Sequence, residues 1–113
     1  MLLLAGCSSA EQPATLVFEA AGRLEDPNIR EASGLARSQR QPGVLWTIND
    51  SGAQEVLYAI DHSGADLGRT ELKKSKNKDW EDLASFTLDG DPYLMVADIG
   101  DNDAKHKSRK LYF

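Results

Sequence analysis

Acidic and amide side chains gather beside several of the apolar runs in this sequence. The densest group lies in residues 78–86, KDWEDLASF, where three carboxylates fall within four positions although like charges repel one another. Carboxylate and amide oxygens are the hard ligands that Ca²⁺ prefers in proteins. The candidate metal ligands are Glu31, Asp50, Glu81, Asp82, Asp98, Asp101 and Asn102. These residue types make a Ca²⁺ site the first hypothesis, if the fold brings them to one place.

Two of these acidic stretches have a simpler interpretation as turns. Residues 49–52 (NDSG) and 98–102 (DIGDN) are good turn sequences, because Asn, Asp and Gly tolerate left-handed backbone and cap it. The acidic run at 79–82 is not explained in this way. Residues 101–103 lack the ligand spacing and the glycine of an EF-hand loop, which excludes that motif.

Candidate substrate-binding residues stand beside the acids: Asn49, Trp80 and Lys78. Trp80 is either a core residue or a lid over a channel. Lys78 belongs to one of two lysine-rich loops that could hold an anionic substrate such as a phosphoester. The alternative is that these are solvated loops whose cations offset nearby carboxylates. No catalytic residue can be singled out, since the GxSxG, P-loop, HExxH and paired CxxC motifs are all missing.

Length, composition and charge limit the classes of function. The chain has 113 residues, of which 41% are apolar and 27% charged, as expected for one small domain. Its formal net charge of −5 excludes a general nucleic-acid binder, because neutralising phosphates needs a basic surface. No apolar run reaches the roughly 18 residues that span a bilayer.

The first residues resemble a secretion signal. Residues 4–7 (LAGC) resemble the bacterial lipobox, in which a cysteine becomes the lipid-bearing first residue. We therefore expect residues 1–7 to be a truncated lipoprotein signal segment with lipidation at Cys7, 8–14 a tether, and 15–113 the folded domain. This predicts a membrane partner through the lipid anchor and a location in the cell envelope, on the outer membrane. The alternative is a frayed apolar N-terminus with an incidental cysteine.

Apolar runs separated by turn residues predict short strands about ten residues apart, which indicates an all-β chain. The expected strands cover residues 34–38, 45–49, 56–61, 67–73, 93–97 and two that begin at Leu83 and Lys110, with a further strand-like run at 16–20.

An internal repeat selects among all-β architectures. A shift of 48 residues places Glu31 on Asp79, Leu35 on Leu83 and Asp50 on Asp98. Repeats of about 40–50 residues with four strands each are typical of propeller blades. We therefore predict a β-propeller fragment of about two four-stranded blades, incomplete at both ends. In an antiparallel meander, the start of the inner strand and the end of the following strand lie on the same rim of the sheet. The acidic residues precede inner strands or follow second strands, so we expect all of them on one face of the propeller.

Four motifs in this order, EASGLARS, LWTINDSG, DWEDLASF and ADIGDN, resemble a family of exported bacterial six-bladed propellers of the TolB-like and phytase-like kind. The resemblance covers residues 28–113 and implies a Ca²⁺ site near a central channel. Because no nucleophile or base can be singled out, we favour a non-catalytic, envelope-anchored protein that binds a small molecule or a protein at its rim. The alternative is a Ca²⁺-dependent hydrolase of esters or phosphoesters, in which a rim carboxylate activates water.

Overall fold

The computed structural model describes residues 15–113, and its regular structure is entirely β. The described residues contain no helix, so none is long and apolar enough to cross a membrane. The strands are β1 (Ala32–Arg37), β2 (Leu45–Asn49), β3 (Val56–Ile60), β4 (Asp66–Glu71), β5 (Trp80–Leu88), β6 (Asp91–Asp98) and β7 (Lys110–Tyr112). The prediction of an all-β chain is confirmed. Cys7 and the expected tether lie outside the described residues.

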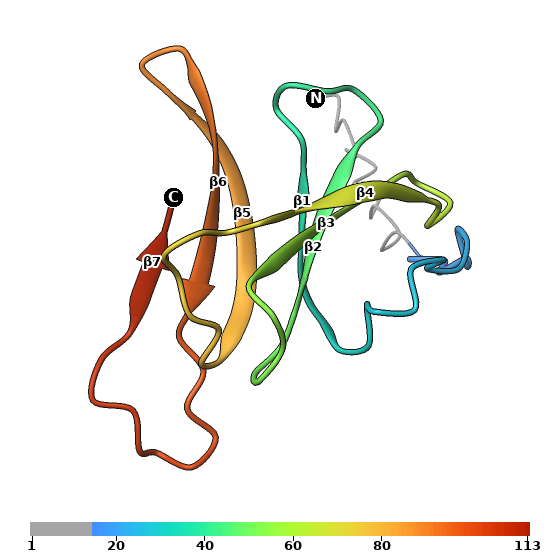
Figure 1. Cartoon of the computed structure of the whole chain (residues 1–113). Helices are drawn as coiled ribbons and strands as arrows, with labels where there is room; N and C mark the ends of the chain where they lie inside the picture. Colours follow the sequence, from blue (N-terminus) through green and yellow to red (C-terminus); the bar gives the residue numbers. More distant parts are fainter. Residues whose placement is uncertain (1–14) are drawn as a thin grey trace, which may run out of the picture.

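Two antiparallel sheets stand side by side (Figure 1). The first sheet has the strand order β1-β2-β3-β4, and the second has the order β5-β6-β7. Each is a simple meander, because turns rich in Gly, Asn and Asp reverse the chain between short apolar strands. The first sheet therefore has the four consecutive strands that the sequence predicts for one blade.

Two predicted elements differ from the structure. The apolar run at 16–20 forms no strand, and Phe18 is 92% exposed, because no neighbouring strand pairs with it. The first strand of the second sheet begins at Trp80 rather than at Leu83. Glu81 and Asp82 therefore lie within β5 and not ahead of it.

The core lies between the two sheets, where β1 packs against β5. Its largest fully buried side chains are Ile48, Trp80 and Val96. Gly34 makes the close approach of the strands feasible, because a Cβ there would lie 2.7 Å from the backbone nitrogen of Leu83. A larger residue at this position would push the two sheets apart.

The two sheets also share a register. Ala32 pairs with Asn49 and Trp80 pairs with Asp98, and each pair is followed by a register shift of the same kind in the first strand of its sheet. Leu35 thus corresponds to Leu83, as the repeat predicts. In the second strands, however, the structure aligns Asn49 with Asp98, one residue away from the sequence alignment. The β5–β6 hairpin contains one residue more between equivalent positions than the β1–β2 hairpin, and this accounts for the difference.

Loops of both sheets meet at one rim, at the lower end of the view in Figure 1. There lie the chain before β1, the β2–β3 turn, the segment that leads into β5, and the long β6–β7 loop. The β1–β2 and β5–β6 hairpins lie at the opposite end. The acidic stretches of the sequence belong to the lower rim.

Candidate metal site

Three carboxylates converge where the two sheets meet at this rim. Asp50, Asp79 and Glu81 each offer an oxygen, and these oxygens all lie within 4.8 Å of one another. Asp50 follows β2, Asp79 immediately precedes β5, and Glu81 occupies the irregularity in β5 between Trp80 and Asp82. Such an irregularity turns one side chain out of the normal alternation of a strand. This acidic triad could hold a metal ion.

Asp79 is the most constrained member of the triad. It is only 4% exposed, and its Oδ1 is buried without a hydrogen-bond partner. Its backbone is fixed on both sides, because its N–H donates to Asp98 Oδ1 at 2.9 Å and its carbonyl accepts from the Gly100 N–H at 3.1 Å. A buried carboxylate oxygen without a partner is costly unless something else compensates it. The set of candidate ligands proposed from the sequence omits Asp79.

Gly100 provides the space in which two of these carboxylates lie. A Cβ at Gly100 would collide with the carboxyl groups of both Asp79 and Glu81. The loop after β6 therefore passes directly beside the triad, and only a residue without a side chain lets it do so. Ile99 and Asp101 flank this point but are not members of the triad.

A side chain outside the acidic runs links the two sheets at the site. Asn77 donates to the carbonyls of Asn49 and Asp50, at 3.1 and 2.8 Å, and accepts from the Trp80 N–H at 3.2 Å. It thus holds the turn that carries Asp50 against the start of β5. The sequence gives no signal for this role, because Asn77 lies in a polar, lysine-rich loop whose composition is typical of a solvent-exposed segment.

Burial and nearby like charges raise the pKa of two carboxyl groups of the triad. Burial raises the pKa of Asp79, and the close carboxyl group and negative charge of Asp50 raise it further, while His106 and the Asn102 backbone act in the opposite direction. Burial also raises the pKa of Glu81, with added repulsion from Asp50 and Asp79. Without a cation, these two carboxyls therefore ionise less readily than ordinary ones.

Three predicted ligands each use at least one oxygen on a backbone N–H group. Asp98 is buried and accepts the Asp79 N–H, and exposed Asp82 accepts the N–H of its neighbour Leu83. Asp101 organises its own loop, since Oδ1 accepts from the Lys105 and His106 N–H groups and Oδ2 pairs with Arg109 at 2.9 Å. The backbone hydrogen bond from His106, above all, lowers the pKa of Asp101. None of the three belongs to the triad.

The remaining predicted residues occupy varied surroundings. Glu31, Asn102 and Lys78 are exposed. Asn49 is 5% exposed, and its side chain accepts from the N–H groups of Arg30 and Glu31 and donates to the Asn28 carbonyl. Trp80 is fully buried, with its indole N–H on the Lys76 carbonyl at 3.2 Å. Of the two alternatives given for Trp80, the structure shows the core residue, so its side chain has no surface to offer a ligand.

The chemistry of the triad suits a hard cation. All three groups offer oxygen, and His106, whose Nδ1 lies 2.9 Å from the Gly100 carbonyl, is not a member of the group. Ca²⁺ binds oxygen at about 2.3–2.6 Å, so two of its ligands lie at most about 5 Å apart. The spread within the triad fits this limit. Mg²⁺ generally takes only one or two protein carboxylates and keeps more of its water.

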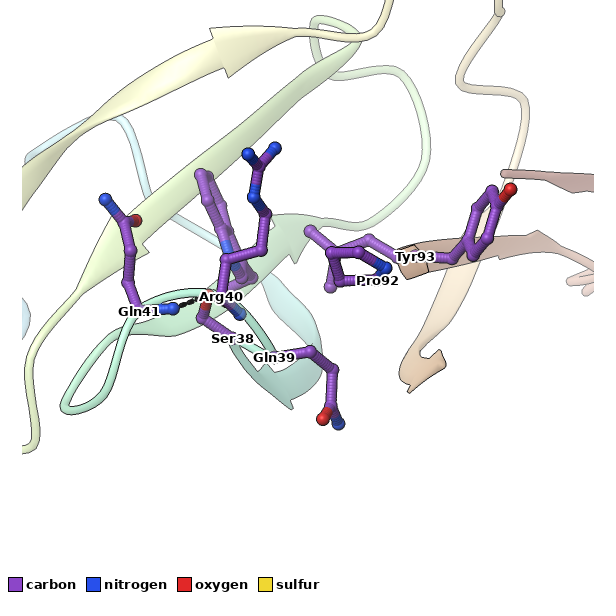
Figure 2. Close-up of a pocket in the computed structure, with 8 residues that line it drawn as sticks. Ser38, Gln39, Arg40, Gln41, Pro92 and Tyr93 are labelled. Carbon is purple, nitrogen blue, oxygen red and sulfur yellow. Dashed lines mark hydrogen bonds between the residues drawn. The ribbon is translucent and has the colours of Figure 1, made fainter. Parts of the chain in front are cut away.

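A separate cleft lies at the opposite end of the sheets (Figure 2). It has a volume of about 550 Å³ and is bounded by the 38–41 segment of one hairpin and by Pro92 of the other. Arg40 is the charged residue of its lining, and Tyr93 points away from Arg40. Its polar lining includes no carboxylate.

Comparisons of the chain with family models, with curated proteins and with solved structures gave no match. The family resemblance drawn from the four motifs therefore stays a prediction.

Proposed function

We propose that this protein is a Ca²⁺-binding propeller module of the cell envelope, with the cation held by Asp50, Asp79 and Glu81 at the junction of two blades. The observation that carries the proposal is the buried, unpartnered Oδ1 of Asp79 within a group of three carboxylates. A divalent cation would give that oxygen a partner and turn the repulsion among the three groups into attraction. The shared register of the two sheets supports the interpretation as consecutive blades.

A binding role fits this rim better than a hydrolytic one. A hydrolase needs a base or nucleophile free to act beside the cation. Asp101 is occupied by its own loop and by Arg109. The Nε2 of His106 is the atom that would act as the base in the hydrolytic alternative, because Nδ1 is used on the Gly100 carbonyl. In the binding role, the cation serves to join the sheets and to shape the rim. Sustained turnover of an aryl phosphate or aryl ester, lost in Asp79→Asn, would contradict this and favour the hydrolase.

The test of the cation site uses a matched pair of neutral substitutions. Asp79→Asn removes a triad carboxylate, and Asp82→Asn removes an exposed carboxylate three positions away while keeping an oxygen for the Leu83 N–H. Calorimetric titration with Ca²⁺ should show binding to the wild type and to Asp82→Asn, and a loss of at least tenfold in affinity for Asp79→Asn. Mg²⁺ should compete poorly.

Melting curves provide a second readout of the same site. A ligand that binds only the folded state stabilises it by about 2.7 kcal/mol when present at 100 times its Kd. The melting temperature should therefore fall on adding EDTA in the wild type and in Asp82→Asn, but not in Asp79→Asn. An equal response of the two variants would show a diffuse charge effect and would remove the basis for a triad site.

The envelope location rests on the sequence of residues 1–14 alone. If Cys7 carries a lipid, Cys7→Ser should move the protein from the membrane fraction to the soluble periplasmic fraction. An unchanged distribution between the two fractions would contradict the lipoprotein interpretation, and it would leave the cation site untouched.

A further inference from the structure

The loop between β6 and β7 is held closed by its own side chains. Asp101 Oδ1 accepts from the backbone N–H groups of Lys105 and His106, at 2.6 and 3.0 Å. The other carboxylate oxygen accepts from Arg109 Nη2 at 2.9 Å, and Arg109 Nη1 donates to the His106 carbonyl at 2.8 Å. Arg109, at the end of the loop, is thereby joined to Asp101 at its start and to His106 between them. These three residues form the loop clasp.

The loop clasp is joined to the acidic triad through Gly100. His106 Nδ1 lies 2.9 Å from the Gly100 carbonyl, and because a carbonyl only accepts, Nδ1 is the donor. The Gly100 N–H in turn donates to the Asp79 carbonyl at 3.1 Å. A Cβ at Gly100 would collide with the carboxyl groups of Asp79 and Glu81, so the loop backbone lies directly beside both. A continuous series of hydrogen bonds thus leads from Arg109 to two of the three carboxylates.

The triad needs a support of this kind because its members repel one another. Ionised carboxylates that are free to rotate turn apart towards water, and a cation then binds only after they have been brought together again. A surrounding structure that holds the ligands in place beforehand removes this cost from the free energy of binding. In metal sites generally, substitution of the residues that orient the ligands lowers metal affinity by about 10–100-fold.

We propose that Arg109 is a positioning residue of the cation site: it keeps the loop clasp closed, and the closed loop keeps Asp79 and Glu81 within reach of Asp50. An arginine suits this position because its planar guanidinium donates to two acceptors from a fixed fork, which the single amine of a lysine does not. Asp101 then acts as part of the clasp rather than as the ligand expected from the sequence. This inference rests on the cation site proposed above and adds to it a residue outside the triad.

The sign of the effect separates positioning from charge. By charge alone, removing the positive Arg109 from the loop beside the site should strengthen the binding of a cation. If Asp101 were a ligand held back by Arg109, the removal would again strengthen binding, because that carboxylate would be released. Only the positioning role predicts weaker binding. Lys107→Ala is the matched control, since Lys107 belongs to the same loop, is exposed and forms no ion pair within residues 15–113.

The experiment is a calorimetric titration of the full chain with Ca²⁺, with circular dichroism to verify that each variant is folded. Arg109→Ala should bind about tenfold more weakly than the wild type. Lys107→Ala should bind as tightly as the wild type or slightly more tightly. Arg109→Lys should lie between the wild type and Arg109→Ala, because it keeps the ion pair with Asp101 and loses the bond to His106. Adding Arg109→Ala to Asp101→Ala should cause no further loss, since either change opens the same clasp.

The results that would overturn the positioning role differ from those that would remove the cation site. A wild type that binds no Ca²⁺ removes the site and this inference with it. A wild type that binds Ca²⁺, together with unchanged or tighter binding in Arg109→Ala, overturns the positioning role and leaves the triad site in place. Equal losses in Arg109→Ala and Lys107→Ala also overturn it, because they assign the effect to the loop as a whole. If Arg109→Ala does not fold, wild-type affinity in Arg109→Lys is the overturning result.

Discussion

Glu31 and Asp79 occupy equivalent positions ahead of the first strand of their sheets. A side-chain oxygen at the end of the next strand holds each backbone N–H: Asn49 Oδ1 lies 3.2 Å from the Glu31 nitrogen, and Asp98 Oδ1 lies 2.9 Å from the Asp79 nitrogen. Glu31 is nevertheless exposed, whereas Asp79 is buried with an oxygen that has no partner. The backbone is held in the same way at both positions, but the Glu31 side chain is exposed to solvent and the Asp79 side chain is buried.

The difference comes from the neighbouring sheet. Asp79 lies against the turn after β2, which belongs to the first sheet, and this contact brings Asp50 close to it. Glu31 has no such neighbour, because within residues 15–113 no strand precedes β1. The cluster of three carboxylates is therefore a property of the junction between two sheets and not of either sheet alone.

The largest expected effect tests this contrast at the apolar positions. Leu83→Ala should lower the free energy of unfolding by about 2–5 kcal/mol, because it leaves a cavity under a covering sheet. Leu35→Ala, at the equivalent uncovered position, should change it by less than about 0.5 kcal/mol. Urea denaturation at a protein concentration where the chain is monomeric gives both values. Similar losses in the two variants would mean that the sheets are not related in the way that their register indicates.

An intermediate effect tests the equivalence of Asn49 and Asp98. Asp98→Ala leaves the buried N–H of Asp79 without an acceptor, which should cost about 1–3 kcal/mol of stability. Asp98→Asn keeps the acceptor, as Asn49 does in the first sheet, and should cost less than about 1 kcal/mol. Chemical denaturation in EDTA separates the two variants. If Asp98→Asn is as unstable as Asp98→Ala, the negative charge of Asp98 matters rather than its hydrogen bond.

The smallest expected effect is a difference in pH dependence between two carboxylates of one rim. The pKa of Asp79 is raised in the fold, so its stabilising contribution is complete below the ordinary carboxyl pKa and is lost as pH rises through the raised value. The pKa of Asp101 is lowered, so its contribution is present above the ordinary carboxyl pKa and is lost as pH falls through the lowered value.

The measurement compares the free energy of unfolding of the variants with that of the wild type, in EDTA, from about pH 3 to about pH 7. Asp79→Asn should gain stability relative to the wild type as pH rises, and Asp101→Asn should lose it. Saturating Ca²⁺ should abolish the gain of Asp79→Asn, because the cation binds the ionised triad. Parallel curves for all three proteins would mean that neither carboxylate titrates in an unusual environment.

The sequence by itself determined the strand content and the repeat. Alternating apolar residues between turn clusters located the core of every strand of the structure, because the period of a strand and the chemistry of a turn are local properties. The strand predicted at residues 16–20 is absent. An apolar run becomes a strand only where another strand pairs with it, and pairing is not a local property of the sequence. The sequence also placed Asp50 and Glu81 on a common rim, which follows from the alternating direction of strands in a meander.

Only the tertiary structure decided which carboxylates meet. Asp98, Asp101 and Asp82 resemble ligands in the sequence, yet each uses its Oδ1 to accept from backbone N–H groups. Asp79 became the centre of the site because the second sheet packs against the first and buries it, and Asn77 holds the two together. Burial and the absence of a hydrogen-bond partner depend on contacts between residues far apart in the chain, and no local pattern of residues encodes them.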